Sequence, residues 1–321
     1  MCLYPRLIRN KRYMPTKKNG YNPPICSDPR LLWVAVGCGN CIECRTQKSR
    51  EWQIRLNKEL ERTKYAYFCT FTFSEESLNE LEKACNSNNV NVLATIGVRR
   101  FLERVRKRTK MSLRHWLITE LGHEGTERIH LHGILFSENE LEREQVEKDW
   151  KYGYIDLGEY CNERSINYIV KYMVKVDNDH KGYEPKIFCS AGLGANYVNE
   201  MTKELHKYKP RETIEYLRLK DGTIVAEPIY YRNKFLTEEE REKLWQEKLD
   251  EQVIYVRGIK CDISTERGRK EYEKILNEQQ KINLSLGYGD NSEKWDRKEY
   301  KRTLKHINTI NKKAPRTRAH K

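Results

Sequence analysis

The stretch ERIHLHGILF, residues 127–136, has the composition of a buried β-strand that carries two histidines. Because side chains alternate across a strand with a period of two, His130 and His132 project from the same face. Two neighbouring imidazoles on one face suggest a metal site. Single histidines are more often ordinary hydrogen-bonded core or surface groups, so the metal interpretation depends on further ligands elsewhere in the chain.

Composition and charge limit the kind of protein and its partners. The chain has 321 residues, 38% of them hydrophobic, and a formal net charge of +14, so a globular protein with a polyanionic partner such as nucleic acid is expected. No window resembles a membrane span and the N-terminus lacks the apolar core of a secretory signal, so we expect a soluble cytoplasmic protein.

Three cysteines are crowded in GCGNCIECRTQKSREW, where Cys38, Cys41 and Cys44 are each three residues apart. This spacing suits zinc, but a closed structural zinc site needs four ligands. Cys2 or Cys26 could complete the set, and free thiols in a turn are the alternative. The residues that follow have helical periodicity, and the basic side chains Arg45, Lys48 and Arg50 indicate either phosphate contact or a solvated charged face.

Alternating apolar residues predict strands at residues 65–73, 113–122 and 128–136, the last two as an antiparallel hairpin. A helix is expected within 95–110, and the polar residues 77–92 read as a loop. The hairpin places Glu120 near the histidines, because cross-strand partners lie only about 5 Å apart. Two imidazoles and one carboxylate would leave open positions on a divalent cation, with Glu124 and Glu127 as substitutes for Glu120.

A candidate for the reacting group lies in SINYIVKYMVKV, residues 165–176, for which Ser165 is the expected N-cap. On a helix, Tyr168, Lys171, Tyr172 and Lys175 share one face opposite the apolar residues. A tyrosine pair at this spacing is often plain amphipathic packing. The interleaved lysines favour a nucleophilic role, since ammonium groups and a polarised phosphate make phenolate attack feasible.

The ordered set CGNCIECRTQKSREW, FTF, TELG, ERIHLHG, YIVKY and SAGLG resembles the HUH endonuclease superfamily, and within it the replication initiators of gokushoviruses, small single-stranded DNA phages of the Microviridae. The resemblance covers roughly residues 1–235. It implies an α+β fold of the HUH-endonuclease (RRM/ferredoxin-like) kind, with a central antiparallel sheet flanked by helices and with N- and C-terminal extensions.

The resemblance also implies an activity and its residues. His130, His132 and Glu120 would hold Mg²⁺ or Mn²⁺, although ELG stands here where the family has an aromatic after the glutamate. Tyr168 or Tyr172, with Lys171 between them, would attack an origin phosphate and leave a 5′-phosphotyrosyl bond and a free 3′-OH. The second tyrosine would later cut the regenerated origin and permit closure of a circle. Spacing does not decide which tyrosine acts first.

The expected partners are single-stranded DNA, the phage replication origin, and a host DNA polymerase and helicase, because the chain has no Walker-type glycine loop. Arg45, Lys48, Arg50 and Lys175 are the candidate DNA-binding residues, and the cytoplasm of a bacterial host is the expected location. A plasmid or transposon HUH nuclease, or a non-catalytic zinc-containing DNA-binding protein, are the alternatives.

We expect three consecutive segments along the chain. Residues 1–60 form a Cys-containing arm and basic helix, 61–205 the nuclease core, and 206–321 a hairpin, helices and a basic tail. A hairpin is expected around Asp221 and Gly222, followed by a helix with Thr237 as N-cap. The last 21 residues hold eight Lys or Arg and no acid, which favours salt-sensitive, sequence-independent DNA affinity.

Overall fold

The computed structural model describes residues 1–122, 127–177, 179–180 and 182–290. Within it the chain forms two compact units. One comprises residues 56–172 and 179–193, and the other residues 1–55, 173–178 and 194–293. They are called here the sheet unit and the cysteine unit. The boundary falls inside α1 (Ile42–Arg62), so these units do not follow the three consecutive segments expected from the sequence, and that division stays a prediction.

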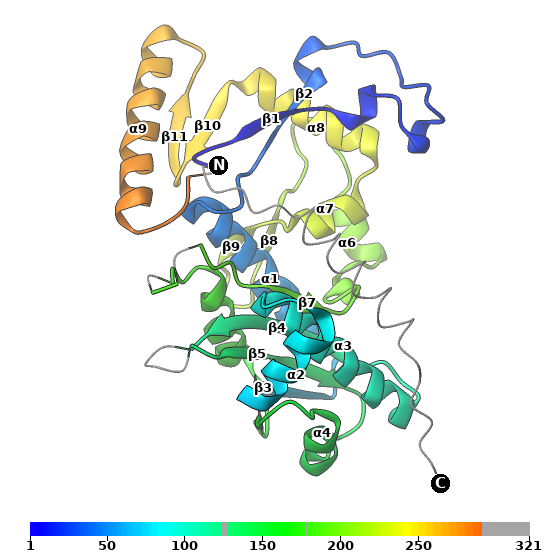
Figure 1. Cartoon of the computed structure of the whole chain (residues 1–321). Helices are drawn as coiled ribbons and strands as arrows, with labels where there is room; N and C mark the ends of the chain where they lie inside the picture. Colours follow the sequence, from blue (N-terminus) through cyan, green and yellow to red (C-terminus); the bar gives the residue numbers. More distant parts are fainter. Residues whose placement is uncertain (123–126, 178, 181, 291–321) are drawn as a thin grey trace. The chain divides into compact units, whose positions relative to one another are not determined.

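A five-stranded antiparallel sheet forms the sheet unit (Figure 1). The strand order is β6-β3-β5-β4-β7, and the strands are β3 (Tyr65–Thr72), β4 (Arg114–Leu121), β5 (Ile129–Ser137), β6 (Ile155–Leu157) and β7 (Ile187–Cys189). The three strands and the antiparallel hairpin expected from the sequence are therefore confirmed. The α+β fold with a central antiparallel sheet flanked by helices is confirmed as well.

One face of this sheet is closed by three helices, α2 (Glu75–Cys85), α3 (Val90–Thr109) and α4 (Arg143–Asp149). The rings of Phe71, Phe73 and Phe101 meet that of Trp150 with centroids 4.8–5.9 Å apart. Such aromatic packing in a fully buried layer supplies much of the core's stability. The expected loop at 77–92 is wrong, because α2 occupies most of it.

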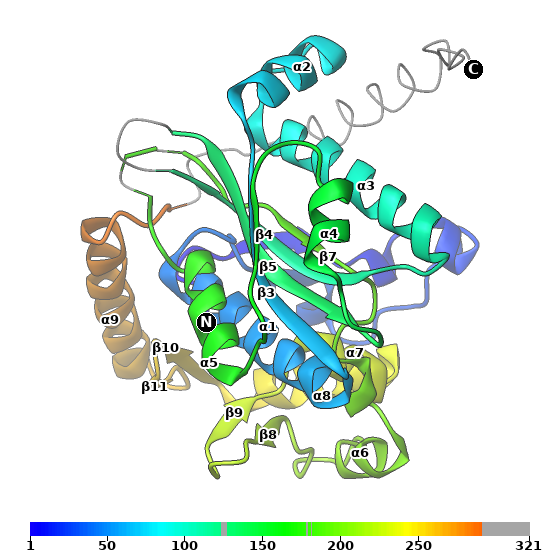
Figure 2. The same ribbon diagram turned by 90° about the horizontal axis from the view of Figure 1, so that it is seen from below.

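The opposite face carries α5 (Glu163–Val170) and the last turns of α1 (Figure 2). Glu59 on α1 is fully buried there and accepts two hydrogen bonds from Arg114 of β4, at 2.6 and 2.9 Å. A buried carboxylate is tolerated only with such pairing, so this contact fixes the end of α1 on the sheet.

Gly133 follows His132 in the central strand and has a packing reason. A Cβ at this position would lie 2.5 Å from the backbone oxygen of Trp116 on β4 and 2.2 Å from a methyl group of Leu117. Strand β5 therefore needs glycine here to keep its register with β4. The register in turn sets which face the two histidines occupy.

The cysteine unit consists of three two-stranded ribbons and several helices. The ribbons are β1 (Arg6–Arg9) with β2 (Trp33–Val36), β8 (Tyr216–Arg218) with β9 (Ile224–Ala226), and β10 (Val253–Val256) with β11 (Ile259–Asp262). The helices are α6 (Glu200–Leu205), α7 (Ile229–Phe235), α8 (Glu238–Glu251) and α9 (Glu266–Ser285).

Two details of this unit were expected from the sequence. The β8–β9 hairpin turns at Asp221 and Gly222, and Thr237 caps α8 in a reciprocal capping box with Glu240. Gly194 of the SAGLG motif has φ +73°, and a Cβ there would lie 2.5 Å from the backbone oxygen of Arg55. Gly194 therefore has a structural role in a close backbone approach.

Single 3₁₀ turns complete the described elements, at Lys11–Tyr13, Lys17–Asn19, Pro29–Leu32, Lys171–Met173 and Ala195–Tyr197. Among the described residues, no helix is long and apolar enough to cross a membrane. The basic tail at 301–321 lies outside the described residues, as does Glu124.

Candidate functional site

The candidate active site lies on the face of the sheet that carries α5. Glu120 of β4 pairs in register with His130 of β5, and His132 is flanked by Ile118 on one side and Thr70 of β3 on the other. These positions all point to the same face, because their neighbours Cys69, Leu131 and Thr119 are buried on the other. The hairpin therefore brings both predicted histidines and the predicted glutamate to one patch.

His132 has the most closely defined surroundings of the three. Its Nε2 lies 3.0 Å from Oε2 of Glu120, and its Nδ1 shares a 3.1 Å hydrogen bond with Oγ1 of Thr70. Both side chains of the His132–Glu120 pair are largely buried. A metal-binding histidine normally has its second ring nitrogen held by such a polar partner, which fixes the tautomer and the ring orientation.

The sequence reasoning missed Thr70, although it carries a signal. In YAYFCTFTF, Thr70 and Thr72 alternate with the buried Cys69, Phe71 and Phe73. A polar residue at every second position of a central strand marks the face that is not closed by core packing.

His130 completes the patch less tightly. Its ring is half buried, and burial together with the nearby His132 lowers its pKa, so the neutral imidazole that binds metals is favoured at neutral pH. His130, His132 and Glu120 do not all bring ligand atoms within 4.8 Å of one another. The three-ligand site for Mg²⁺ or Mn²⁺ stays a prediction, as do the substitute ligands; of these, Glu127 is exposed beside Arg128.

The two candidate tyrosines lie directly over this patch. The ring of Tyr172 stacks on that of His132, with centroids 4.8 Å apart and an angle of 8° between the planes. The hydroxyls of Tyr168 and Tyr172 are 2.9 Å apart, and the ring of Tyr168 lies 6.0 Å from Phe68 of β3. Two phenols thus share one hydrogen bond beside the His132–Glu120 pair.

The tyrosines differ in their surroundings. Tyr168 is 51% exposed, whereas Tyr172 is partly buried. Burial, and secondly the hydrogen bond with Tyr168, raises the pKa of Tyr172, so this phenol holds its proton at neutral pH. Attack on a phosphate by either oxygen would need positive charge close to the reacting atoms.

The helix that carries these tyrosines differs from the expected one at both ends. Asn162 is the N-cap and forms a capping box with Ser165, so the predicted cap at Ser165 is wrong. The α-helix ends at Val170 and a single 3₁₀ turn follows, so Lys175 lies beyond the helix. Lys171 is exposed on that turn, between the two tyrosines in sequence.

The predicted DNA-binding residues Arg45, Lys48 and Arg50 lie on the first part of α1, in the cysteine unit, which also contains Lys175. Arg45 donates a 3.3 Å hydrogen bond to the carbonyl oxygen of Lys175, and its guanidinium lies over the ring of Tyr288 at 5.8 Å. Lys48, Arg50 and Lys175 are exposed. Their contact with DNA stays a prediction.

The third group of predicted residues forms a complete cluster. The sulfurs of Cys2, Cys38, Cys41 and Cys44 all lie within 4.8 Å of one another, with Cys2–Cys41 at 3.8 Å and Cys38–Cys44 at 3.9 Å. A zinc tetrahedron with bonds of about 2.3 Å has sulfur–sulfur edges of roughly 3.8 Å. The cluster therefore could hold a metal such as zinc.

Backbone groups support the same arrangement. The N–H groups of Tyr4 and Cys38 donate to the sulfur of Cys2, and the N–H of Cys41 donates to that of Cys38. Hydrogen bonding with Cys2 lowers the pKa of Cys38, to about 6, which favours the thiolate that binds metals. Of the two fourth ligands left open by the sequence, Cys2 is in the cluster, whereas Cys26 donates to the backbone oxygen of Asp28.

Comparison with known proteins places this site in a family. Residues 66–177 match the family model of the replication-associated protein ORF2, and this span includes Glu120, both histidines and both tyrosines. The chain is therefore a member of the replication-associated protein ORF2 family, which confirms the resemblance to initiators of the gokushovirus type.

A particular relative supports that membership. The chain is 25% identical over 197 residues to the "Replication-associated protein ORF2" of Spiroplasma virus 4. The match covers 54% of this chain and 60% of the viral protein, so it is a distant homology over part of both. No solved structure matches the chain.

Proposed function

We propose that the protein is a site-specific single-stranded DNA nickase and ligase that initiates rolling-circle replication of a small single-stranded DNA phage genome. The observation that carries this proposal is the arrangement of the ring of Tyr172 on His132, with Tyr168 hydrogen-bonded to Tyr172 and Glu120 paired to His132. An oxygen nucleophile beside an imidazole and carboxylate pair suits transfer of a phosphoryl diester.

The chemistry conserves one phosphodiester bond as another. A tyrosine oxygen, from Tyr168 or Tyr172, attacks the origin phosphate and forms a P–O bond while the bond from phosphorus to the 3′ oxygen breaks. The 3′ oxygen leaves as a hydroxyl and takes up a proton equivalent to the one that the phenol gives up. No nucleotide cofactor is needed, and the free 3′-OH serves a host polymerase while a host helicase separates the strands.

A divalent cation, Mg²⁺ or Mn²⁺, fits the donor set of the patch. His130 and His132 offer neutral imidazoles and Glu120 offers a carboxylate, a set that suits a hard or intermediate cation with open positions. When bound, the cation would polarise the phosphate and stabilise its charge. Thr70 orients His132, and Lys171 would neutralise charge on the leaving oxygen.

The cysteine cluster is proposed as a structural zinc site, because four thiolates close the coordination shell and leave no position for substrate. Zinc would then join the N-terminal residues to the start of α1. The second candidate function, a non-catalytic zinc-containing DNA-binding protein, is favoured by this cluster alone. A plasmid or transposon HUH nuclease would share the active site and differ in its origin.

The test is a denaturing gel of purified protein with labelled single-stranded origin DNA and Mn²⁺. We expect a protein-linked DNA band that disappears with chelator. The band should survive Tyr168→Phe and Tyr172→Phe singly and disappear in the double variant, since either phenol can act. A matched control is Tyr160→Phe, an exposed tyrosine of the same unit outside the pair. If competent origin DNA and metal give no band with the wild type, the non-catalytic function holds.

A further inference from the structure

The ribbon β1–β2 exposes side chains that soluble proteins usually bury. Trp33 is 49% exposed and Ile8 is 43% exposed. The strands pair Arg9 with Trp33 and Ile8 with Val34, so Trp33 and Ile8 lie on opposite faces. A two-stranded ribbon with apolar side chains in water on both faces is marginal by itself, and a ligand that covers one face would stabilise it.

The Trp33 face pairs an aromatic ring with a cation. The guanidinium of its register partner Arg9 lies over the indole ring, 5.8 Å from the centroid. Among the described residues, the side chains of Arg9 and the neighbouring Lys11 form no ion pair. An exposed indole beside exposed cations is the combination that proteins use to stack a base and hold its phosphate.

The charge around the ribbon has one sign. Residues 1–27 contain no Asp or Glu, and their six basic residues are Arg6, Arg9, Lys11, Arg12, Lys17 and Lys18. This stretch is long enough to attract a polyanion by itself, and it contains no acid that would repel a phosphate next to Trp33.

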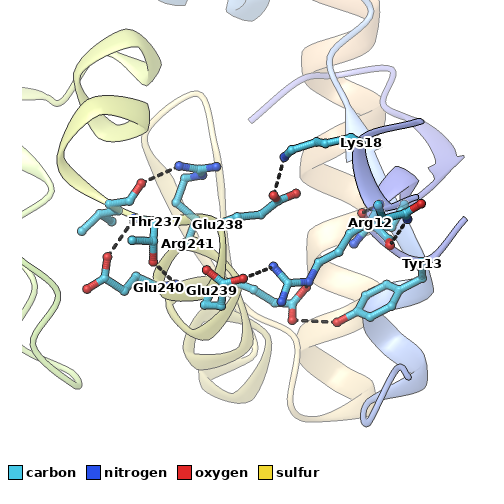
Figure 3. A network of polar contacts seen from close by, with 12 residues as sticks. Arg12, Tyr13, Lys18, Thr237, Glu238, Glu239, Glu240 and Arg241 are labelled. Carbon is cyan, nitrogen blue, oxygen red and sulfur yellow. Dashed lines mark hydrogen bonds and ion pairs between the residues drawn. The ribbon is translucent and has the colours of Figure 1, made fainter. Parts of the chain in front are cut away.

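The segment after the ribbon is fixed to α8 by some of these cations (Figure 3). Arg12 lies 3.1 Å from Glu239, Lys18 lies 2.5 Å from Glu238, and the hydroxyl of Tyr13 donates to Glu242 at 2.6 Å. The acidic side chains of α8 therefore neutralise Arg12 and Lys18, which leaves Arg9 and Lys11 as the cations beside the exposed indole. The anchored segment presents the ribbon as a fixed surface.

From these observations we propose that the Trp33 face of the β1–β2 ribbon binds single-stranded DNA, with a base stacked on Trp33 and the neighbouring phosphates held by Arg9 and Lys11. This inference rests on the proposed function only in taking DNA as the partner. Unpaired bases fit better than a duplex, because only an unstacked base offers its face to the indole.

The test measures binding of the full-length protein to a fluorescently labelled single-stranded oligonucleotide of mixed sequence by anisotropy. Trp33→Ala should weaken binding roughly five- to thirty-fold, the effect of losing one stacked base, and Trp33→Phe should restore most of it. Arg9→Gln should weaken binding and lower the slope of log K against log salt by about one.

The matched control is Trp245→Ala. Trp245 is also exposed, at 40%, but lies on the acidic helix α8, so its loss should leave DNA binding unchanged. The proposal is overturned if Trp33→Ala binds as tightly as the wild type, or if Trp245→Ala weakens binding equally. It is also overturned if Trp33→Ala weakens duplex binding more than single-strand binding, which would place the ribbon in a groove.

The readout separates this inference from the active-site proposal. Binding to the ribbon is scored without cleavage, and the Tyr168 and Tyr172 double variant should bind the oligonucleotide as the wild type does. If no phosphotyrosyl bond forms but Trp33→Ala still weakens binding, the active-site proposal fails and the ribbon proposal stands. If the covalent bond forms and Trp33→Ala binds normally, only the ribbon proposal fails.

Discussion

The cysteine cluster and the histidine patch are both candidate metal sites, and they are built in opposite ways. Four sulfurs lie at the spacing of a closed tetrahedron, in a segment held by backbone N–H groups. The patch instead offers two imidazoles and a carboxylate, from a sheet face that lies beside a pair of tyrosines. A closed set of soft ligands serves stability, and an open set of harder ligands serves chemistry.

Removing a ligand should therefore have different consequences in the two regions. At the patch the sheet and its core remain in place, so activity should be lost and folding retained. At the cluster the metal is the main connection between the first residues and α1, so stability should suffer. The following predictions test this contrast, from the largest effect to the smallest.

His132→Ala should abolish cleavage, with a loss of about 10³-fold or more in the rate of covalent bond formation. DNA affinity should stay within about a few-fold of the wild type, because basic surfaces supply most of the binding. Gel assays of the covalent product and anisotropy of the same oligonucleotide measure the two quantities. Normal cleavage by this variant would show that His132 is no ligand and the metal assignment is wrong.

Thr70→Val should have a smaller effect of the same kind. Valine keeps the shape of the side chain but removes the hydroxyl that bonds Nδ1 of His132. Outer partners of metal-binding histidines usually contribute 10- to 100-fold, so the cleavage rate should fall by about that factor and the metal concentration for half-maximal rate should rise. Thr72→Val, two residues along on the same strand, serves as the control, and equal losses in both would argue against a specific role for Thr70.

Cys44→Ser should remove the bound zinc and lower the thermal midpoint by about 5 °C or more, because an incomplete ligand set binds the metal weakly. Cys26→Ser is the matched control, since Cys26 lies in the same unit and outside the cluster. Elemental analysis gives the zinc content and calorimetry the midpoint. Zinc at one equivalent in Cys44→Ser would contradict the four-cysteine site.

The two regions also differ in how they hold a buried carboxylate. Glu59 in the sheet unit accepts two hydrogen bonds from Arg114, whereas Glu227 in the cysteine unit lies beside His206 and has one hydrogen bond, at 3.4 Å, from Arg232. Burial raises the pKa of Glu227 to about 7, against the opposing effect of Arg232. The folded protein thus keeps this proton to a higher pH than the unfolded chain does.

Stability should therefore fall as the pH rises from about 4.5 to 7, by about 1–3 kcal/mol from this group. Glu227→Gln keeps the neutral form at every pH, so it should flatten this part of the stability profile. Chemical denaturation at several pH values measures the slope. An unchanged slope in the variant would mean that Glu227 ionises in the folded protein as easily as in the unfolded one.

Local pattern was enough to predict the sheet that carries the patch. Alternation of apolar residues identified β3, β4 and β5 to within a few residues, and the hairpin put Glu120 opposite His130. The same reasoning read 77–92 as a loop because polar residues dominate it. Leu78, Leu81 and Cys85 recur at helical spacing there and face the core, so the signal for α2 was present but weak.

The remaining features of the site depend on contacts between distant residues. Cys2 is separated from Cys38 by 36 positions, and no local rule chooses it over Cys26 as the fourth thiol. The stacking of Tyr172 on His132 requires α5 to end where it does, after Asn162 has set its start. The cap was missed because Ser165 also has the chemistry of an N-cap residue and lies three residues further on.

Peptide mapping by mass spectrometry after incubation with origin DNA and Mn²⁺ tests the central claim most directly. Nuclease digestion should leave a nucleotide bound through phosphate to the peptide that contains Tyr168 and Tyr172, and chelator should prevent it. A phosphotyrosyl bond on another tyrosine would move the active site elsewhere in the chain. The absence of any covalent nucleotide, with DNA that the protein demonstrably binds, would contradict the nickase.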